Sequence, residues 1–494
     1  MRINSLLKGI NYTIVQGSEE KEVSGISWDS RRVKPGSVFI CVKGNNVDRH
    51  SFAAQAVKDG ASALIVDHEV YRIPNDITII KVKDTRIALG TAAAAIYDYP
   101  SEAFKLIGVT GTNGKTSVTW FIERILQYCG KTPGIISTIE NRIGIQKLDT
   151  VKINPTTPDN LELQQCFREL ADKGASHVIM EVTSSALAQN RVYGCNFDLA
   201  IFTNLTQDHL EEHGTMENYK NEKLKLFKMC RFAVINRDDF YSQEFINGAE
   251  CPVLTYGINN ESSLTAKDIE YSISGTNFIL LYENKSYPIH INVAGKFNVY
   301  NVLAAIGACL QYGLSIDNAA AAIESIEFVK GRYEYIKNSR GISVIVDYAH
   351  SPHSLENILA SVKEFTEKRV IVVFGCGGDR DKIKRPIMGK IAGNIADYCI
   401  ITSDNPRKEN PLNIIEEIEK GIAATRCKYE KLQDRKKAII TALSMAKRGD
   451  SVVIAGKGHE SYQIIGEKYM YFDDGETVRE YFEDKTRWDN SKDS

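Results

Sequence analysis

The sequence lacks the features that mark a membrane, secreted or nucleic-acid-binding protein. No stretch approaches the ~20 consecutive apolar residues that a membrane-spanning helix needs, and residues 1–9 lack the long apolar core of a signal peptide. The ten cysteines form no Cys-x-x-Cys pair, which argues against a zinc site and favours reduced, mostly buried thiols. The formal net charge of −2 gives no overall attraction to polyanions. We therefore expect a soluble cytoplasmic protein with no membrane span and no nucleic-acid partner.

The chain of 494 residues is long enough for about three domains. Short β-prone runs alternate with helical stretches along its length, which is typical of α/β domains with mostly parallel sheets. A helix-breaking segment at residues 98–101 and a new strand pattern near residue 336 divide the chain into residues 1–102, 103–335 and 336–494. We predict an α/β fold with an N-terminal α/β domain, a central domain with a mostly parallel sheet, and a Rossmann-like C-terminal domain.

One segment of the central domain departs from this alternation. Ile269, Tyr271 and Ile273 alternate with polar residues, and a turn-forming Ser-Gly-Thr-Asn at 274–277 leads into a second apolar run at 278–282. This pattern predicts an antiparallel hairpin, which we place at the edge of the sheet.

The most informative stretch is a glycine-rich loop between a predicted strand and a predicted helix. It reads Gly-Thr-Asn-Gly-Lys-Thr-Ser over Gly111, Thr112, Asn113, Gly114, Lys115, Thr116 and Ser117. Glycines allow backbone N–H groups to approach phosphate oxygens, and the helix N-terminus adds positive potential. The lysine reaches the terminal phosphates, and the following hydroxyl suits Mg²⁺. Val109 stands where the strict pattern has glycine, so the loop is a variant phosphate-binding loop.

Polar residues follow two further predicted strands of the same domain. Glu181 ends an apolar run, and Asp208 and His209 follow another. Ligands of open α/β sheets bind at the carboxyl ends of the strands, and a carboxylate there suits Mg²⁺. A strand-end glutamate without a ligand, a helix-capping aspartate and a surface histidine are the alternative interpretations.

Five segments together resemble the Mur ligases, enzymes that add amino acids to a UDP-linked muramyl peptide in peptidoglycan synthesis. They are Gly-Thr-Asn-Gly-Lys-Thr at 111–116, Asn-Leu-Thr-Gln-Asp-His-Leu at 204–210, Gly-Lys-Phe-Asn-Val-Tyr-Asn at 295–301, Gly-Arg at 331–332 and Asp-Tyr-Ala-His at 347–350. The resemblance covers essentially the whole chain. It implies a UDP-binding N-terminal domain, a central ATP-binding domain and an amino-acid-binding C-terminal domain.

Four other segments resemble the branch of the family that adds the third amino acid. They lie at residues 29–31, at 154–158, at 377–381 and 384–386 together with 404–407, and at 456–460. This resemblance implies that ATP converts the D-Glu side-chain carboxylate of UDP-MurNAc-L-Ala-D-Glu into an acyl phosphate, which the amine of meso-diaminopimelate then attacks. The reaction consumes ATP with Mg²⁺ at two sites, and the resemblance implies a monomeric enzyme.

The resemblance also assigns catalytic residues and ligands of the metal. Lys115, Lys223 and His209 are the implied catalytic residues, and Lys223 is implied to carry a CO₂-derived carbamate. The implied metal ligands are Thr116, Glu181, His209 and the carbamate of Lys223. Composition alone favours a solvated lysine at position 223, because its neighbours are charged. A lysine kept neutral by burial can capture CO₂, and the resulting anionic oxygen suits Mg²⁺.

Substrate contacts follow from the same resemblance. The implied ATP contacts beyond the glycine-rich loop are Asn298, Asn301, Arg332 and Asp347. The implied contacts to the UDP-muramyl peptide are Ser30, Asn154, Thr156, Thr157, Thr183, Gln189 and Arg191. The implied contacts to diaminopimelate are Arg380, Asp404, Asn405, Pro406, Arg407, Gly456 and Glu460.

Arg407 decides which amino acid we expect. Diaminopimelate is lysine with a second carboxylate, which a planar guanidinium can hold through paired hydrogen bonds. Lysine would leave that guanidinium unpaired. One position near Arg407 departs from the family pattern, because Asn410 stands where an acidic residue is usual. The alternatives are a lysine-adding ligase, a ligase like folylpolyglutamate synthetase, and a P-loop ATPase switch or nucleic-acid motor. This sequence lacks the basic stripe that nucleic-acid binding needs, which argues against the motor.

Overall fold

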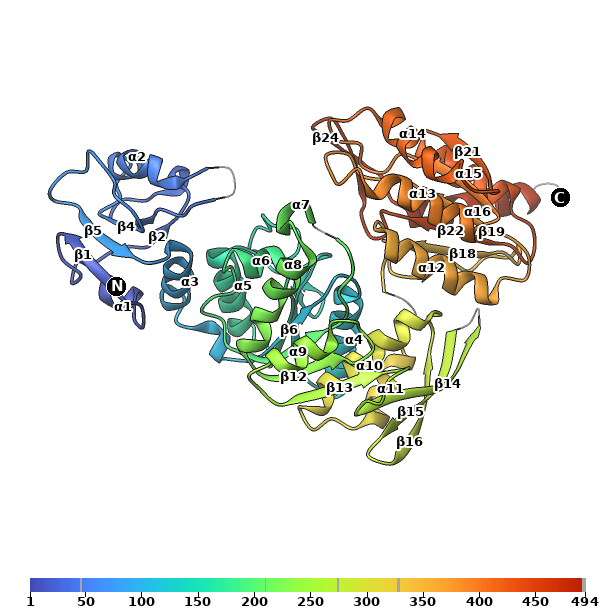
Figure 1. Cartoon of the computed structure of the whole chain (residues 1–494), viewed down its shortest axis with the longest axis horizontal. Helices are drawn as coiled ribbons and strands as arrows, with labels where there is room; N and C mark the ends of the chain where they lie inside the picture. Colours follow the sequence, from blue (N-terminus) through green and yellow to red (C-terminus); the bar gives the residue numbers. More distant parts are fainter. Residues whose placement is uncertain (45–46, 209, 273–274, 327–328, 491–494) are drawn as a thin grey trace.

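The computed structural model describes the chain except for residues 45–46, 209, 273–274, 327–328 and 491–494. Three large sheets, each accompanied by helices, follow one another along the chain. Figure 1 shows the N-terminal and C-terminal units on either side of the central one. The predicted α/β class with three units is confirmed. The domain limits at residues 102 and 335 stay a prediction.

The N-terminal unit is built on a five-stranded sheet of order β1-β5-β4-β3-β2. All neighbours are parallel except β1 and β5. Helix α3 packs its alanine-rich face on the sheet, where Ala88, Ala92 and Ala95 join the core with Val38 and Ile65. The elements are α1 (Ile3–Leu6), β1 (Tyr12–Gln16), β2 (Ile26–Ser27), η1 (Ser30–Arg32), β3 (Val38–Ile40), η2 (Arg49–Phe52), α2 (Ala53–Lys58), β4 (Ala63–Val66), β5 (Thr78–Val82) and α3 (Thr85–Ile96).

The central unit contains an eleven-stranded sheet of order β16-β15-β14-β13-β12-β11-β6-β10-β7-β8-β9. Six neighbouring pairs from β14 to β7 are parallel, and the antiparallel pairs lie at the two edges. The strands are β6 (Lys105–Thr110), β7 (Pro133–Ile136), β8 (Asn141–Ile143), β9 (Gln146–Lys147), β10 (His177–Glu181), β11 (Phe197–Phe202), β12 (Cys230–Asn236), β13 (Val253–Gly257), β14 (Leu264–Ser272), β15 (Gly275–Tyr282) and β16 (Lys285–Ile291).

Helices cover both faces of this sheet. On strand β6, Ile107 and Val109 belong to the core shared with α4 and α10, whereas Leu106 belongs to the opposite core with Phe167 of α5. A strand that is apolar on both faces is expected for a parallel strand buried between helical layers. The helices are η3 (Pro100–Glu102), α4 (Lys115–Tyr128), α5 (Asn160–Asp172), α6 (Ser184–Ala188), α7 (Leu210–His213), α8 (Met216–Leu224), η4 (Lys225–Lys228), α9 (Ser242–Gly248), α10 (Lys296–Leu310) and α11 (Ile316–Glu324).

The predicted edge hairpin is confirmed, with one difference at its turn. Strands β14 and β15 pair antiparallel at the edge of the sheet. The predicted turn at 274–277 is shorter than expected, because β15 already begins at Gly275. Residues 273–274 lie outside the described part of the chain.

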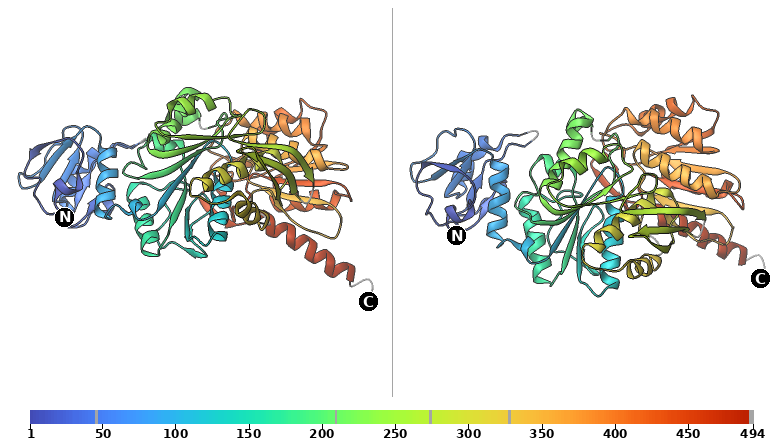
Figure 2. Two further views of the ribbon diagram at one scale, coloured as in Figure 1. Left: turned by 90° about the horizontal axis from the view of Figure 1, so that it is seen from below. Right: turned by 60° about the horizontal axis from the view of Figure 1, so that its bottom comes forward.

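The C-terminal unit has a six-stranded sheet of order β17-β18-β22-β19-β20-β21, in which only β17 is antiparallel to its neighbour. Its strands are β17 (Glu334–Tyr335), β18 (Ser343–Asp347), β19 (Val370–Phe374), β20 (Tyr398–Thr402), β21 (Lys428–Leu432) and β22 (Ser451–Ala455), with a separate hairpin of β23 (Tyr462–Ile465) and β24 (Lys468–Tyr471). Its helices are α12 (Pro352–Phe365), α13 (Lys384–Ile395), α14 (Pro411–Ile422), α15 (Arg435–Met445) and α16 (Asp474–Asn490), which extends away from the unit in Figure 2.

Two expectations from composition can be compared with the structure. All ten cysteines are free, and seven of them are buried. Within the described part of the chain, no helix combines the length and apolar character that crossing a membrane requires.

Candidate active site

The glycine-rich loop connects β6 to α4 through two glycines with positive φ. Gly111 has φ +147° and Gly114 has φ +87°, and a Cβ at Gly111 would clash with the hydroxyl of Thr203. Asn204 fixes the loop from the end of β11, since its amide accepts from Asn113 N (3.0 Å) and donates to Asn113 O (3.0 Å). The loop is therefore held open at a helix N-terminus, where backbone N–H groups can meet phosphate oxygens.

Two lysines donate to one carbonyl of this loop. Lys115 Nζ lies 2.9 Å from Gly111 O, and Lys223 Nζ lies at the same distance from the same oxygen. Lys223 is 1% exposed, so the interpretation of residue 223 as a solvated surface lysine is wrong. Burial, together with the charge of Lys115, holds the pKa of Lys223 well below its ordinary value. The position therefore favours a neutral amine.

Thr116 and Glu181 form an oxygen-rich pair beside the loop. Thr116 Oγ1 donates to Glu181 Oε1 (2.9 Å), and both carboxylate oxygens of Glu181 accept from Thr138, at 2.8 Å from its N and 3.0 Å from its Oγ1. Arg332 Nη2 reaches Thr116 Oγ1 from the other side (3.1 Å). A hydroxyl and a buried carboxylate are ligands that Mg²⁺ prefers, so this pair fits the predicted metal site. His209 lies outside the described residues.

A cavity of about 260 Å³ lies between the glycine-rich loop, α10 and the start of the C-terminal unit. Of the predicted ATP contacts beyond the loop, Asn301, Arg332 and Asp347 line it. Asn298 does not, because its amide donates to Ala294 O (2.9 Å) at the start of α10. The cavity walls combine a glycine-rich loop with aromatic and polar side chains, a composition that suits a nucleotide.

An aromatic and histidine group at this cavity was not predicted from the sequence. Tyr348 lies under the Arg332 guanidinium (4.6 Å), and its ring is close to those of His350 (4.6 Å) and His459 (4.8 Å). Burial lowers the pKa of His350 to about 4 and that of His459 to about 3. Both rings are therefore neutral near pH 7, which keeps Arg332 the cation at this position. Their only sequence signal was membership of the 347–350 and 456–460 motifs.

The structure brings together most of the residues predicted to contact the muramyl peptide. Thr157 Oγ1 donates to Glu181 O (2.9 Å) and lies 3.2 Å from Thr183 Oγ1. Thr156 Oγ1 lies 3.0 Å from Thr138 Oγ1, next to the same glutamate. Arg191 donates to Thr157 O (3.3 Å) and to Gln189 Oε1 (2.9 Å).

Two residues predicted for this substrate stand apart from that group. Asn154 lies in the loop before α5, and Ser30 begins η1 in the N-terminal unit. Sequence reasoning missed Lys152 in the same loop as Asn154. Its Nζ donates to Ser137 O (2.6 Å) and Thr138 O (2.8 Å), and burial lowers its pKa to about 8. Nothing in the local sequence distinguishes this lysine from a surface lysine.

The predicted diaminopimelate residues gather after β20 and β22. Asn405 Nδ2 donates to Glu460 Oε2 (2.8 Å), and the buried Lys457 donates to Asn405 Oδ1 (3.1 Å) and Glu460 Oε2 (3.0 Å). Burial raises the pKa of Glu460. Within the described residues, Asp404 Oδ2 is buried without a hydrogen-bond partner, and it faces Gly456, where a Cβ would lie 2.6 Å away.

Arg407 follows Pro406 in a left-handed conformation with φ +49°. Its backbone N donates to Ile464 O (3.0 Å), its O accepts from Gly466 N (2.7 Å), and its Nη1 donates to Gly378 O (2.7 Å). These bonds tie the arginine to both the β23–β24 hairpin and the loop after β19. Arg380 of that loop is exposed and bonds only Asp379 O among the described residues (3.2 Å).

A buried ion-pair network holds this loop from behind. Arg385 is fully buried, and it donates to Glu409 (2.9 Å), Glu417 (2.8 Å) and Gly377 O (3.1 Å). The Arg385 guanidinium lowers the pKa of Glu409 to about 2. Asn410, the departure from the acidic residue usual in the family, caps α14 by accepting from Leu412 N (3.0 Å). Asparagine caps helices as well as aspartate does, so this substitution keeps the local structure.

Comparison with family models assigns all three units to one family. The matches are to the Mur ligase family catalytic domain at residues 22–97, the Mur ligase middle domain at 109–309 and the Mur ligase glutamate ligase domain at 331–458. The chain belongs to the Mur ligase family. The models cover the glycine-rich loop, Glu181, Lys223, Arg332 and Arg407.

This Mur ligase is similar over nearly its whole length to proteins named as diaminopimelate ligases. It is 46% identical to UDP-N-acetylmuramoyl-L-alanyl-D-glutamate--2,6-diaminopimelate ligase 2 of Clostridium acetobutylicum, over 97% of this chain and 99% of that protein. It is 44% identical to the UDP-N-acetylmuramoyl-L-alanyl-D-glutamate--2,6-diaminopimelate ligase of Caldanaerobacter subterraneus, over 97% of this chain and 98% of that protein. A solved structure of such a ligase is 31% identical with a TM-score of 0.71, over 98% and 99%.

More distant structures share the fold alone. MurF ligase of Thermotoga maritima, solved with ADP, is 19% identical with a TM-score of 0.60 and covers 88% of this chain and 94% of its own. Folylpolyglutamate synthase of Mycobacterium tuberculosis, also solved with ADP, is 18% identical with a TM-score of 0.62 and covers 75% and 91%.

Proposed function

We propose that this Mur ligase joins meso-diaminopimelate to the D-Glu side-chain carboxylate of UDP-MurNAc-L-Ala-D-Glu, at the expense of ATP, in peptidoglycan synthesis. The observation that carries the proposal is the grouping around Arg407, Asp404 and Glu460. The same chain has a cavity of about 260 Å³ at the glycine-rich loop, and it is 46% identical to a protein named as a diaminopimelate ligase. We also propose that the enzyme is a cytoplasmic monomer.

The glycine-rich loop would present ATP for the first step. The γ-phosphoryl group passes from ATP to a carboxylate oxygen of the D-Glu side chain, which releases ADP and forms an acyl phosphate. In the structure, Lys115 Nζ donates to Gly111 O (2.9 Å) and Thr112 O (2.8 Å). The side chain can turn from these carbonyls to the phosphates. The amine of diaminopimelate then attacks the acyl carbon, and phosphate leaves. Positioning and charge stabilisation supply the rate in such a reaction.

Mg²⁺ fits the oxygen donors of this site, and we propose two sites for it. Thr116 and Glu181 would hold one ion, and His209 is proposed to contact the second. A carbamate on Lys223 would add an anionic oxygen ligand, which the burial and low pKa of this lysine support. When bound, the metal would neutralise the phosphate charge as the phosphoryl group moves.

Arg407 is the residue that we propose selects diaminopimelate over lysine. The free carboxylate of diaminopimelate would pair with its guanidinium, and the neighbouring ammonium would meet Asp404 Oδ2 and Glu460. Lysine would leave Arg407 without that partner. A site built around such a polar group can reject an analogue that lacks it by a factor of ~10⁴.

A coupled phosphate-release assay tests the proposal. Phosphate release should require UDP-MurNAc-L-Ala-D-Glu and diaminopimelate together, and lysine or a folate with glutamate should not replace them. Release with ATP alone would indicate an ATPase switch. Release with the folate pair would indicate a folylpolyglutamate synthetase, a family whose likeness here is at the level of fold.

A further inference from the structure

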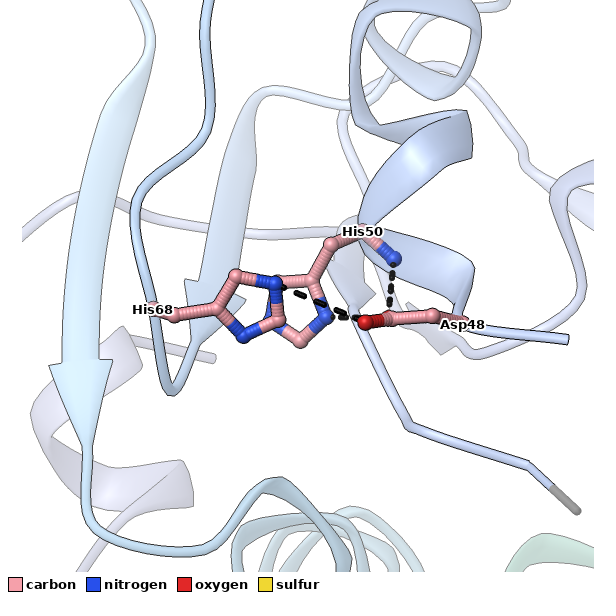
Figure 3. A group of neighbouring side chains, drawn as sticks. All are labelled: Asp48, His50 and His68. Carbon is pink, nitrogen blue, oxygen red and sulfur yellow. Dashed lines mark hydrogen bonds and ion pairs between the residues drawn. The ribbon is translucent and has the colours of Figure 1, made fainter.

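A compact group of histidine and aspartate side chains lies in the N-terminal unit, outside the site described above. Asp48 and His50 lie at the start of η2, and Asp67 and His68 directly follow β4. The His50 ring is 4% exposed and packs against the His68 ring, with 3.7 Å between ring centroids. Figure 3 shows both rings beside the carboxylate of Asp48. None of these residues lines the cavity beside the glycine-rich loop.

The four side chains are arranged in two shells. The inner ring nitrogens face Asp48, with His50 Nδ1 2.7 Å from Oδ1 and His68 Nε2 3.5 Å from Oδ2. The outer ring nitrogens face Asp67 Oδ1, at 3.3 Å from His50 Nε2 and 2.5 Å from His68 Nδ1. Thr85 Oγ1 donates to the second oxygen of Asp67 (3.3 Å) and so holds it in place.

We propose that Asp48, His50 and His68 bind a transition-metal dication, Zn²⁺ being the probe of choice. One ligand atom from each of the three lies within 4.8 Å of the others. Two ligands of one tetrahedral Zn²⁺ ion are about 3.4 Å apart when each bond is about 2.1 Å long, close to the 3.5 Å between Asp48 Oδ2 and His68 Nε2. Small side-chain rotations would bring the third donor, His50 Nδ1, to a similar distance from the other two.

The outer carboxylate distinguishes this group from a simple hydrogen-bonded cluster. A metal-bound histidine usually donates its other ring N–H to a carboxylate, which orients the ring and strengthens it as a ligand. The Asp67 carboxylate lies 2.5 Å from His68 Nδ1 and can serve that ring in this way, whereas His50 Nε2 accepts a hydrogen bond from the backbone N of Asp67 (3.3 Å). On metal binding, the ion would replace the proton that His50 Nδ1 holds toward Asp48. That proton would move to His50 Nε2, which gives up its bond from the backbone N of Asp67 and can turn toward Asp67 Oδ1, 3.3 Å away.

The donor set also selects the class of metal. Two imidazole nitrogens and one carboxylate suit Zn²⁺ and its neighbours in the first transition row, whereas Mg²⁺ and Ca²⁺ prefer oxygen-only sites. The site is therefore chemically distinct from the proposed Mg²⁺ sites at Thr116 and Glu181. Bound metal would clip the segment that follows β3 to the segment that follows β4.

The test is metal binding to the full-length protein. Zn²⁺ titration followed by calorimetry should show one ion bound per chain, and the absorption spectrum of the Co²⁺-substituted protein should show nitrogen and oxygen ligands. His68→Gln should weaken Zn²⁺ affinity by more than about tenfold, and Asp67→Asn by about tenfold through the outer shell. His68 is 52% exposed, so its substitution leaves the core intact, which circular dichroism checks.

A matched control is His290→Gln in β16, whose ring bonds only neighbouring asparagines in the described structure. Its Zn²⁺ affinity should equal that of the wild type. The proposal is overturned if the wild type binds no Zn²⁺, if His68→Gln binds as tightly as the wild type, or if bound Co²⁺ shows a sulfur-to-metal charge-transfer band, which would place the ion on cysteine.

Discussion

Replacing Lys223 by methionine should abolish activity and yet make the protein more stable. Lys223 is buried, and its Nζ shares Gly111 O with Lys115. Methionine retains most of the side-chain volume and carries no charge, and Gly111 O keeps its bond from Lys115. Activity is lost because the proposed carbamate cannot form. Stability rises because the folded state no longer holds two amines against one carbonyl.

The size of the gain follows from the geometry. Each Nζ lies 2.9 Å from Gly111 O, so the two nitrogens are at most twice that distance apart. At an effective dielectric constant of about 20, two positive charges at that separation repel by at least about 3 kcal/mol. The wild type avoids this repulsion by leaving Lys223 neutral. Keeping a lysine deprotonated at a pH below its ordinary pKa itself costs free energy of folding. We therefore expect Lys223→Met to gain about 1–3 kcal/mol, or about 2–4 °C per kcal/mol for a domain of ordinary size.

The pH dependence gives this prediction its sign. Unfolded Lys223 binds a proton that the folded state releases, because burial lowers the folded pKa. Stability of the wild type therefore increases with pH up to about 10.5, and the advantage of Lys223→Met should shrink over the same range. Thermal unfolding followed by circular dichroism, at pH 7 and pH 10 and without added bicarbonate, measures this.

Lys220 on the same helix supplies the control. It is also buried, but it pairs with Glu217 (2.7 Å) and Glu244. Lys220→Met should therefore lower the melting temperature. The reasoning is refuted if Lys223→Met melts below the wild type at pH 7, or if it keeps normal turnover.

Three further predictions follow from single contacts. Arg407→Ala should lower kcat/KM for diaminopimelate by more than about 100-fold with the KM for ATP unchanged, and steady-state kinetics would contradict this by showing equal values. Gly111→Ala should abolish ATP binding in calorimetry, because its Cβ would clash with Thr203 at a φ of +147°; ATP bound with wild-type affinity would argue against the loop geometry. Glu409→Gln should destabilise the protein at pH 7. Because Arg385 lowers the pKa of Glu409 to about 2, the difference in unfolding free energy between wild type and variant, measured with urea, should vanish as pH falls from 4.5 toward 2. A difference independent of pH would exclude the ion pair as its cause.

Local sequence was sufficient for the features that depend on neighbouring residues. The phosphate-binding loop follows from glycine spacing between a strand and a helix, and Thr116 and Glu181 are close because parallel strands end at one edge of the sheet. The edge hairpin followed from alternation. Its turn was placed wrongly because Gly275 fits both a turn and a strand, and pairing with β16 decided between them.

Features that depend on distant packing could not be read from the sequence. The charged neighbours of Lys223 suggested exposure, but the helix carrying it packs over the loop after β6. Arg407 was singled out by its motif, whereas its left-handed backbone and its anchor through Arg385 and Glu409 exist only once three loops meet. The scattered Asp48, His50 and His68 gave no sequence signal, because two separate strand ends bring them together.

The most direct test of the account is a competition between amino acids. The enzyme is incubated with ATP, Mg²⁺, UDP-MurNAc-L-Ala-D-Glu and equal concentrations of meso-diaminopimelate and L-lysine, and the product is identified by mass spectrometry. The account predicts the diaminopimelate adduct almost alone. A product carrying mainly lysine, or equal amounts of both, would contradict the role of Arg407 and the function proposed for this chain.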